Sequence, residues 1–198
     1  QHIISIAGGC DIHGKEKQCV DIETCKKAII DTKEKVEAYA ISGYMSIRNP
    51  EHELIVAELV HTLTGYPVVC GHHLTGDLGV YERTVTAILN ARLIPLIAHL
   101  IDAVKECLTM EGIEAPLMVV KGDGSLISES VARERPIETI LSGPAASLIG
   151  AQVLAKSSLG LVVDMGGTTT DIALLKDGKP LINDEGATVG DWLTRVKA

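Results

Sequence analysis

Aromatic side chains are scarce in this sequence, which contains no Phe, one Trp and four Tyr among 198 residues. Even so, 46% of the residues belong to the set AVILMFWYC. So apolar a chain can bury enough surface to offset its conformational entropy, which excludes an intrinsically disordered protein. We therefore expect an aliphatic core. The length suits one ordinary domain, or one domain and part of another.

Basic residues are also few, since 18 Lys and Arg oppose 26 Asp and Glu and the formal net charge is -8. A nucleic-acid partner requires a basic stripe that neutralises phosphates. Here the Lys and Arg residues are scattered, and the densest run is interleaved with acidic residues. We therefore expect no nucleic-acid partner.

A long apolar run is missing as well. The longest uncharged stretch, residues 139–155, contains Ser, Gly, Pro and Gln, whereas a membrane span needs about 20 mostly apolar residues. The first residues also lack the basic and then apolar segments of a secretory signal. We therefore expect no membrane partner and a cytoplasmic location.

The five cysteines are odd in number and include no Cys-x-x-Cys pair. This pattern is typical of free thiols in a reducing compartment rather than of a disulfide framework. Cys70, His72, His73 and Asp77 could converge on a metal ion. No second spaced pair completes a tetrahedral ligand set, however, which favours an ordinary loop or a pair on the substrate side.

Local patterns in the first third of the chain predict alternating strands and helices. Residues 36–45 contain a short strand-like run. Asn49 and Pro50 then predict a helix start, with Asn as the N-cap and Pro as the first helical residue. Gly65 should end this helix, and residues 67–70 have the composition of a short buried strand.

The strongest helical periodicity runs through residues 81–108, with Pro95 inside it. The proline should either kink one long helix or divide two, and Gly112 should end the helical segment. Residues 117–120 then read as a strand. The alternation of strands and helices indicates an α/β organisation in which helices bury the strands, and no repeat or linker marks a domain boundary.

A different pattern begins near residue 159, where two apolar strands enclose a polar, glycine-bearing turn. Residues 160–164 predict a buried strand that ends on a carboxylate, and residues 172–175 predict its partner. Asp177 and Gly178 are a two-residue hairpin signal before residues 180–182. Because the glycine pair lies between two strands, the motif differs from a P-loop and from a dinucleotide fingerprint, both of which open a helix.

The turn itself predicts an anion site. Gly166 and Gly167 can adopt a positive φ and let backbone N–H groups approach an anion without a Cβ in the way. Thr168, Thr169 and Thr170 add hydroxyl donors. The alternative is a tight hairpin in which Gly serves geometry and Thr serves strand propensity.

Two carboxylates, Asp164 and Asp171, flank this turn. They could hold Mg²⁺ through water or orient a nucleophile. Carboxylates beside an anion site make chemical sense mainly when a cation bridges them and the anion. The complete run Asp-Met-Gly-Gly-Thr-Thr-Thr-Asp between apolar strands therefore favours phosphate binding over a plain turn.

Two further segments are candidates for ligand contact. Ser142 looks like the N-cap of a helix, and small residues such as Gly143 leave its first turn uncovered, which suits either an anion or close helix packing. Lys121 begins a Lys-Gly-Asp-Gly-Ser segment at the C-terminal end of a strand. That place suits a ligand loop in an open sheet or an ordinary turn.

Together, these motifs resemble the hydantoinase/5-oxoprolinase A-subunit family. The resemblance covers most of the chain in order. The residues that carry it are 49–53, 81–84, 90–91, 121–124, 141–146, 164–171 and 190–192.

The resemblance implies an α/β, actin-like ATPase (ribonuclease-H-like) fold, and the use of ATP to phosphorylate an amide or carbonyl oxygen before a lactam ring opens; relatives carboxylate ketones. It implies ATP and Mg as cofactors, a small cyclic-amide substrate, and a companion B subunit or a homo-oligomer. It maps residues 164–171 onto the second phosphate hairpin of that fold, with Ser142 and Gly143 as further nucleotide contacts. Asp171 is the candidate catalytic residue, Asp164 and Asp171 the candidate Mg ligands.

The sequence also departs from the family pattern. The first phosphate hairpin is absent, and the chain begins at Gln1. We therefore expect a fragment that hydrolyses no ATP by itself: residues 1–156 as a helical α/β section of the first lobe, residues 157–198 as the start of the second. His72 and His73 replace a Ser- and Glu-bearing loop, which leaves the substrate open. A non-catalytic ATP-dependent regulator or a sugar-kinase-like phosphotransferase stays an alternative.

Overall fold

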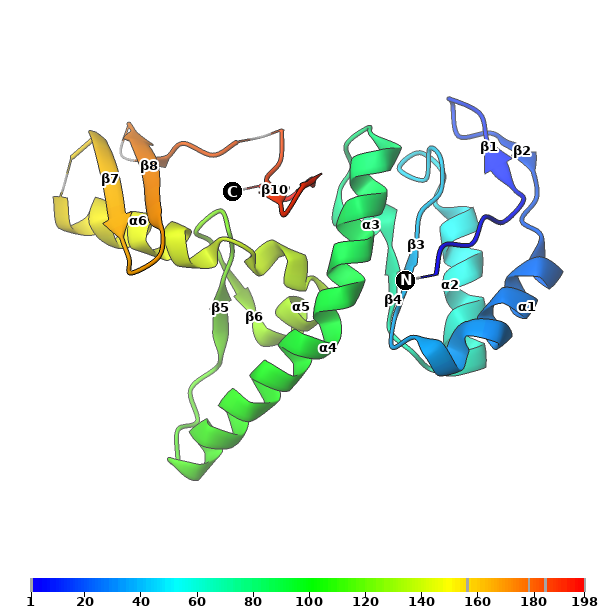
Figure 1. Cartoon of the computed structure of the whole chain (residues 1–198), viewed down its shortest axis with the longest axis horizontal. Helices are drawn as coiled ribbons and strands as arrows, with labels where there is room; N and C mark the ends of the chain where they lie inside the picture. The colour runs from blue at the N-terminus through cyan, green and yellow to red at the C-terminus, as the bar shows by residue number, and fades with distance from the viewer. Residues whose placement is uncertain (1, 156, 178, 184, 198) are drawn as a thin grey trace. The chain divides into compact units, whose positions relative to one another are not determined.

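The computed structural model describes residues 2–155, 157–177, 179–183 and 185–197, which form two compact units. Unit 1 comprises the chain up to Leu96 together with Thr188–Arg195, and unit 2 comprises Ile97–Ala187 with the residues from Val196 on (Figure 1). The domain boundary predicted at Lys156 lies outside the described residues and stays a prediction, as does Gly178 of the predicted hairpin turn.

Unit 1 contains a small strand–helix–strand motif. The parallel strands β3 (Tyr39–Ile41) and β4 (Val68–Cys70) are joined by α2 (Glu51–Thr64), and Ile41 pairs with Cys70. This confirms the two strands and the helix predicted here. The described part of unit 1 also contains α1 (Ile22–Thr32), a 3-10 turn (Lys33–Lys35), α3 (Gly71–Leu74) and the hairpin of β1 (Gly9–Cys10) and β2 (Glu16–Gln18).

The start of α2 differs from the prediction by one residue. Pro50 occupies the N-cap position and Glu51 is the first helical residue, while the side chain of Asn49 accepts a 3.1 Å hydrogen bond from the Glu51 N–H. Asn49 thus binds the backbone N–H of Glu51, although it lies one residue before the N-cap. The predicted end is confirmed, because Gly65 has φ 69° and donates its N–H to the carbonyl of His61.

Helix α4 (Val80–Met110) continues through Pro95 without interruption. The alternative of two separate helices is therefore wrong, because one missing N–H does not outweigh the hydrogen bonds and apolar contacts on both sides. Gly112, at φ 67°, follows its end as predicted. Ala87 and Ala91 pack with Val69 of β4 in the core of unit 1.

Within the described residues, α4 is also the one helix long and apolar enough to cross a membrane. The core helix of a folded domain passes the same test of length and composition. Arg83 and Asn90 lie on α4 and are 1% and 0% exposed. These buried polar side chains favour a helix packed inside protein over one surrounded by lipid.

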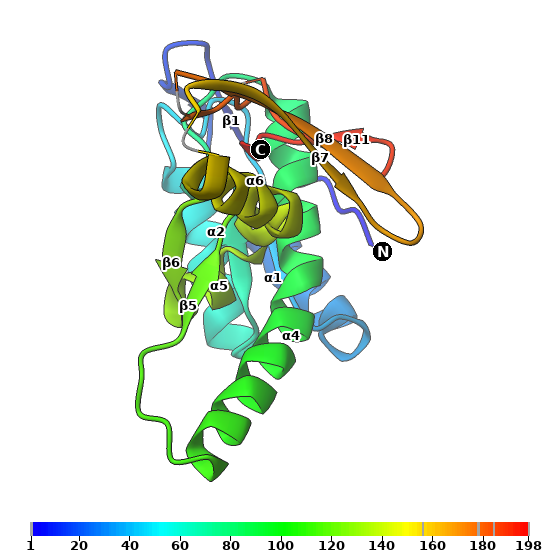
Figure 2. The ribbon, with the colours of Figure 1, turned by 90° about the vertical axis from the view of Figure 1, so that its left-hand side faces the viewer.

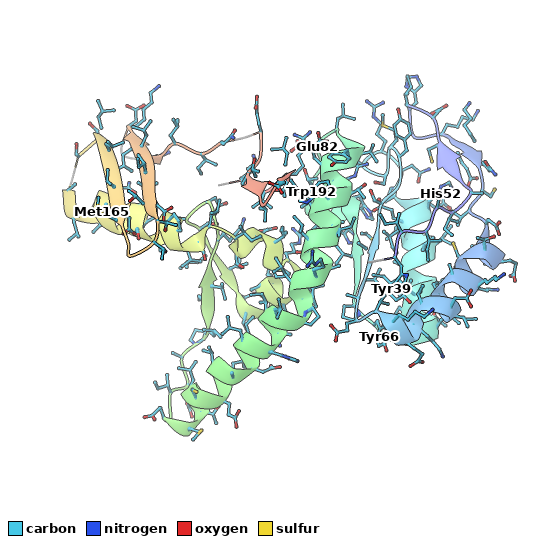
Figure 3. The ribbon with its side chains drawn as sticks, viewed as in Figure 1. Tyr39, His52, Tyr66, Glu82, Met165 and Trp192 are labelled. Atoms are coloured by element: carbon cyan, nitrogen blue, oxygen red, sulfur yellow. The ribbon has the colours of Figure 1, made fainter. Side chains whose placement is uncertain are left out.

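The residues of unit 1 near the end of the chain form the small hairpin of β10 (Thr188–Val189) and β11 (Trp192–Leu193). Arg195 follows it, donates through Nη2 to the carbonyl of Leu78 at 2.9 Å and lies 3.7 Å from Glu82. Figure 3 shows Trp192 beside the first turns of α4, where its ring lies 6.3 Å from that of Tyr81. Trp192 and Arg195 therefore pack against the start of α4.

Unit 2 holds two antiparallel sheets and two further helices. Strands β5 (Met118–Val120) and β6 (Leu126–Ser128) form a hairpin, which confirms the predicted strand at 117–120. Helix α5 (Glu129–Glu134), a 3-10 turn (Pro136–Thr139) and α6 (Ser142–Ala155) follow. Strands β7 (Leu159–Met165), β8 (Thr170–Lys176) and β9 (Lys179–Pro180) form the second sheet.

The predicted meander of the second sheet is confirmed, but its predicted burial is not. Leu175 on the face toward α6 is 2% exposed, whereas Leu161, Val163 and Ile172 on the opposite face are 50–67% exposed. Figures 1 and 2 show the β7–β8 hairpin crossing α6 with its tip beyond the helix. The apolar composition of β7 and β8 suits strands that are buried on both faces. Among the described residues, however, α6 covers only one face, so the apolar side chains of the other face are exposed.

Candidate phosphate-binding site

The polar turn predicted from the sequence connects β7 to β8. Met165 pairs with Thr170 and Asp164 pairs with Asp171, so four residues, 166–169, form the loop. The N–H of Gly166 donates to the carbonyl of Thr169 at 2.9 Å and closes it. Side chains of directly paired residues share one face of a sheet. The fold therefore places the two carboxylates side by side on one face of the hairpin.

The glycines do not act as predicted. Neither Gly166 nor Gly167 has φ in the left-handed region, so the expected nest with positive φ is wrong. The N–H of Gly166, the first loop residue, bonds the carbonyl of Thr169, the last, and neither glycine takes a positive φ within this loop. A Cβ at Gly166 would lie 3.4 Å from the carbonyl of Thr169, and one at Gly167 would meet nothing within 4 Å. Space above Gly167 is thus open to a ligand.

The whole motif is exposed. Asp164, Gly166, Gly167, Asp171 and the three threonines between them, Thr168, Thr169 and Thr170, are all solvent-accessible. In the described part of the chain, no Lys, Arg or His lies within ion-pair distance of either carboxylate. Two adjacent carboxylates repel each other, and a divalent cation would relieve that repulsion. The donor set fits Mg²⁺ held directly or through water.

Helix α6 contacts this site through a residue that the sequence did not single out. The hydroxyl of Ser147 donates to Oδ2 of Asp164 at 2.7 Å. The sequence predicts ligand contact at Ser142 and Gly143 of this helix instead. No sequence spacing signals this contact, because the helix and the strand meet only in the folded unit.

The start of α6 differs from the prediction by one residue. Ser142 is the first helical residue, not the N-cap, and Leu141 precedes it with φ 64°. Gly143 is exposed, and a Cβ there would meet nothing within 4 Å. The first turn is thus uncovered, as predicted, and the choice between anion contact and close packing stays open.

The loop at Lys121 satisfies its own charges. The ammonium of Lys121 lies 2.9 Å from Glu138 and 3.3 Å from Asp123, and Asp123 accepts hydrogen bonds from the N–H and hydroxyl of Ser125. Burial lowers the pKa of Lys121, but Glu138 and Asp123 outweigh it and raise the pKa overall. Gly124 has φ 82° in the turn. Of the two alternatives, this geometry favours the ordinary turn.

The predicted Cys–His cluster is partly assembled. All five cysteines are free, as expected. Cys70 and His72 lie together, and Glu53 of α2 joins them. Asp77 instead accepts a hydrogen bond from the hydroxyl of Thr75 and donates its N–H to the same hydroxyl.

A cavity of about 1040 Å³ lies in unit 1 among β3, α1, α2 and α4. Its lining is largely aliphatic, with Ser42, Thr84 and Glu53 among its polar residues. The hydroxyls of Ser42 and Thr84 lie 2.6 Å apart and satisfy each other. The sequence gave no sign of this cavity, because its walls come from elements up to about 90 residues apart.

Models of known protein families match most of this chain. The family model described as hydantoinase/oxoprolinase matches residues 83–197, and the model of the hydantoinase/oxoprolinase N-terminal region matches residues 1–64. The chain belongs to the hydantoinase/oxoprolinase family.

Among curated relatives of this hydantoinase/oxoprolinase chain, the caprolactamase subunit alpha of Pseudomonas jessenii is 34% identical over 181 residues, or 88% of this chain and 26% of the relative. The acetophenone carboxylase gamma subunit of Aromatoleum aromaticum is 27% identical, over 89% of this chain and 25% of the relative. The 5-oxoprolinase of Saccharomyces cerevisiae is 24% identical over 73% of this chain. The chain thus spans about a quarter of the length of the first of these relatives.

Two solved structures have the same fold. The ATP-dependent caprolactamase of Pseudomonas jessenii is 30% identical, with a TM-score of 0.79 over 97% of this chain and 28% of that one. Nucleotide-free acetone carboxylase, at 24% identity and a TM-score of 0.78, supports the fold alone. These likenesses confirm the predicted fold class, a part of an actin-like ATPase fold.

Proposed function

We propose that this chain is the part of an ATP-dependent cyclic-amide hydrolase that contributes a phosphate-binding hairpin, residues 164–171. The observation that carries the proposal is the pairing of Asp164 with Asp171 beside an exposed Gly-Gly-Thr turn. Family membership supports it, as does a caprolactamase relative whose structure is described as ATP-dependent. Two carboxylates at an open, glycine-bearing turn suit a metal–phosphate ligand and have no evident packing role.

The chain's own residues would act by positioning charge. Asp164 and Asp171 would hold Mg²⁺, directly or through water, and the metal would neutralise charge on the transferred phosphoryl group. The hydroxyls of Thr168 and Thr169 would donate to phosphate oxygens. Asp171, on the opposite strand from Asp164, would orient the metal or a water molecule.

Phosphorylation explains why a hydrolase of cyclic amides would use ATP. An amide is a poor electrophile, and transfer of the γ-phosphoryl group to its oxygen forms one P–O bond as the bond to ADP breaks. The carbon then accepts an attacking water more readily, and the ring C–N bond breaks as the nitrogen takes up a proton. A second water hydrolyses the resulting acyl phosphate to a carboxylate and free phosphate. Because relatives are named as subunits, we further propose that the parent protein has a companion subunit. We also propose that the parent protein is cytoplasmic.

Ketone carboxylation is a second candidate for the parent reaction, favoured by the acetophenone carboxylase relative. The hairpin would play the same part in both reactions, because each begins with an oxygen that must be activated. The proposal for residues 164–171 is therefore independent of which carbonyl substrate is used.

Titration of the ¹⁵N-labelled chain with a non-hydrolysable ATP analogue, with and without Mg²⁺, tests the proposal. We expect Mg²⁺-dependent amide shifts at residues 166–169 and their loss in Asp164→Asn. The matched control is Asp177→Asn, at the far end of β8, which should retain them. Shifts confined to other residues would contradict the assignment. The chain alone should show no ATP turnover, and turnover abolished by Asp164→Asn would disprove its partial character.

A further inference from the structure

A carboxylate, a thiol and an imidazole come together in unit 1, away from the phosphate hairpin. Ligand atoms of Glu53, Cys70 and His72 all lie within 4.8 Å of one another. The side chain of Glu53 is 1% exposed and that of His72 is 12% exposed, while Cys70 is 4% exposed. Within the described residues, this is the one group of three such side chains with metal-binding potential.

The strand–helix–strand motif explains why these residues meet. Cys70 is the last residue of β4, His72 lies in α3 directly after it, and Glu53 lies in the first turn of α2. A helix that connects two parallel strands begins at the carboxyl edge of the sheet, where the second strand also ends. The fold therefore brings Glu53 to the pair, although 17 residues separate it from Cys70.

The carboxylate is held rigidly. Oε1 of Glu53 accepts the N–H of Gly43 at 2.7 Å, and Oε2 accepts the N–H of His72 at 3.1 Å. Nδ1 of His72 lies 2.6 Å from the same Oε2, within hydrogen-bond distance. The thiol of Cys70 lies 3.8 Å from the backbone carbonyl of Glu53. All three side chains are thus fixed in place before any ligand binds.

A nucleophilic role for Cys70 does not fit this environment. Burial, together with the charge of Glu53, raises the pKa of the Cys70 thiol to about 11. A thiol of this kind is inert as a nucleophile near neutral pH. A bound metal ion, by contrast, deprotonates a coordinating thiol outright.

A buried guanidinium lies beside the cluster. Arg83, also 1% exposed, donates through Nη2 to the carbonyl of Gly43 and through Nη1 to that of Asp77, but its Nε has no partner among the described residues. A Cβ at Gly71 would lie 3.2 Å from Arg83 and 3.5 Å from Glu53. The guanidinium is therefore bound to backbone oxygens beside the cluster, and no direct ion pair with Glu53 forms.

We propose that Glu53, Cys70 and His72 form a Zn²⁺ site. Zinc is the divalent metal that binds well to sulfur, nitrogen and oxygen ligands in one site. On binding, the thiol loses its proton to solvent, His72 binds through Nδ1 as the neutral imidazole with its proton on Nε2, and one Zn–S, one Zn–N and one Zn–O bond form. Thiolate and carboxylate then balance the metal charge. Three protein ligands leave a fourth position for water or substrate.

Titration of the full, metal-free chain with Co²⁺ tests this site, because Co²⁺ replaces zinc and reports its ligands by absorption. We expect one equivalent to produce a thiolate-to-cobalt charge-transfer band in the near ultraviolet and visible bands of a tetrahedral ion. One equivalent of Zn²⁺ should then bleach them. Cys70→Ser should abolish the charge-transfer band, and His72→Gln should weaken Co²⁺ binding at least tenfold.

Matched controls separate this site from adventitious binding. Cys25→Ser removes another buried thiol of unit 1, and His61→Gln and Glu58→Gln change exposed residues of α2. All three should bind Co²⁺ as the unmodified chain does. Because Glu53→Gln could fail to fold, Cys70→Ser and His72→Gln decide the outcome once circular dichroism shows that they fold. No charge-transfer band, or a band that survives Cys70→Ser or disappears in Cys25→Ser, would overturn the site.

Discussion

The hydroxyl of Ser147, on α6, donates a 2.7 Å hydrogen bond to Oδ2 of Asp164, on β7. This bond joins the helix of the Ser-Gly-Pro-Ala-Ala motif to the carboxylate that opens the phosphate hairpin. It fixes one oxygen of Asp164, while the other has no hydrogen-bond partner among the described residues. A helix residue thereby sets the orientation of a candidate metal ligand.

Ser147→Ala should weaken Mg²⁺-dependent binding of an ATP analogue by about three- to tenfold, because a hydrogen bond to a charged group is lost. Ser147→Thr retains a hydroxyl and should restore most of the affinity. Fluorescence or NMR titration at several Mg²⁺ concentrations measures the effect. Equal affinity of Ser147→Ala and the unmodified chain, in conditions where Asp164→Asn abolishes binding, would show that Ser147 does not position the carboxylate.

Neighbouring leucines on β8 should differ sharply in their effect on stability. Leu175→Ala should lower the free energy of unfolding by about 2–5 kcal/mol, because this side chain is 2% exposed and its removal leaves a cavity. Leu174 is 49% exposed, so Leu174→Ala should change it by only about 0.5 kcal/mol. Urea denaturation of both variants measures the difference. Similar losses would mean that both faces of the sheet are covered.

Two glycines of unit 2 should respond to alanine in opposite directions. Gly124 has φ 82°, and a Cβ there would lie 3.0 Å from the side chain of Ile149. Gly124→Ala should therefore destabilise the protein by about 1–2 kcal/mol. Gly150 lies inside α6 in open space, so Gly150→Ala should stabilise it by about 0.5–1 kcal/mol. Thermal unfolding distinguishes them, and a stabilising Gly124→Ala would contradict the turn geometry.

The carboxylate of Asp123 should contribute stability that depends on pH. Burial raises its pKa, but the hydrogen bonds of Ser125 and the ammonium of Lys121 outweigh this and hold the pKa below its ordinary value of 3.8. A carboxylate with a depressed pKa stabilises the fold above its unfolded-state pKa, and this contribution disappears as the pH falls through the folded-state value.

Unfolding free energies of the unmodified chain and of Asp123→Asn should therefore differ at pH 6 and converge below about pH 3. Ser125→Ala, which removes only the hydroxyl donor, should reduce the difference in part. A gap between the unmodified chain and Asp123→Asn that stayed constant from pH 6 to pH 2 would show that the carboxylate gains nothing from its neighbours.

Local signals predicted individual elements well. Gly65 ended α2 as expected, and the repeat of apolar residues located α4. The two apolar strands around a polar turn were predicted, with Asp164 and Asp171 flanking that turn, and the structure adds that these two residues pair. The predicted glycine conformation failed, because a turn closed by one hydrogen bond satisfies its geometry without positive φ. Burial of β7 also failed, since composition alone does not say how many faces of a strand are covered.

The sequence by itself determined α2, α4, the strands around them, the hairpin motif and the family, because each depends on residues close together along the chain. Tertiary structure alone decided which distant residues meet. Ser147 reaches Asp164 because α6 packs on one face of the sheet, and Glu53 reaches His72 because a connecting helix begins where the next strand ends. Contacts of this kind leave no spacing in the sequence, since packing between elements sets them rather than the period within one.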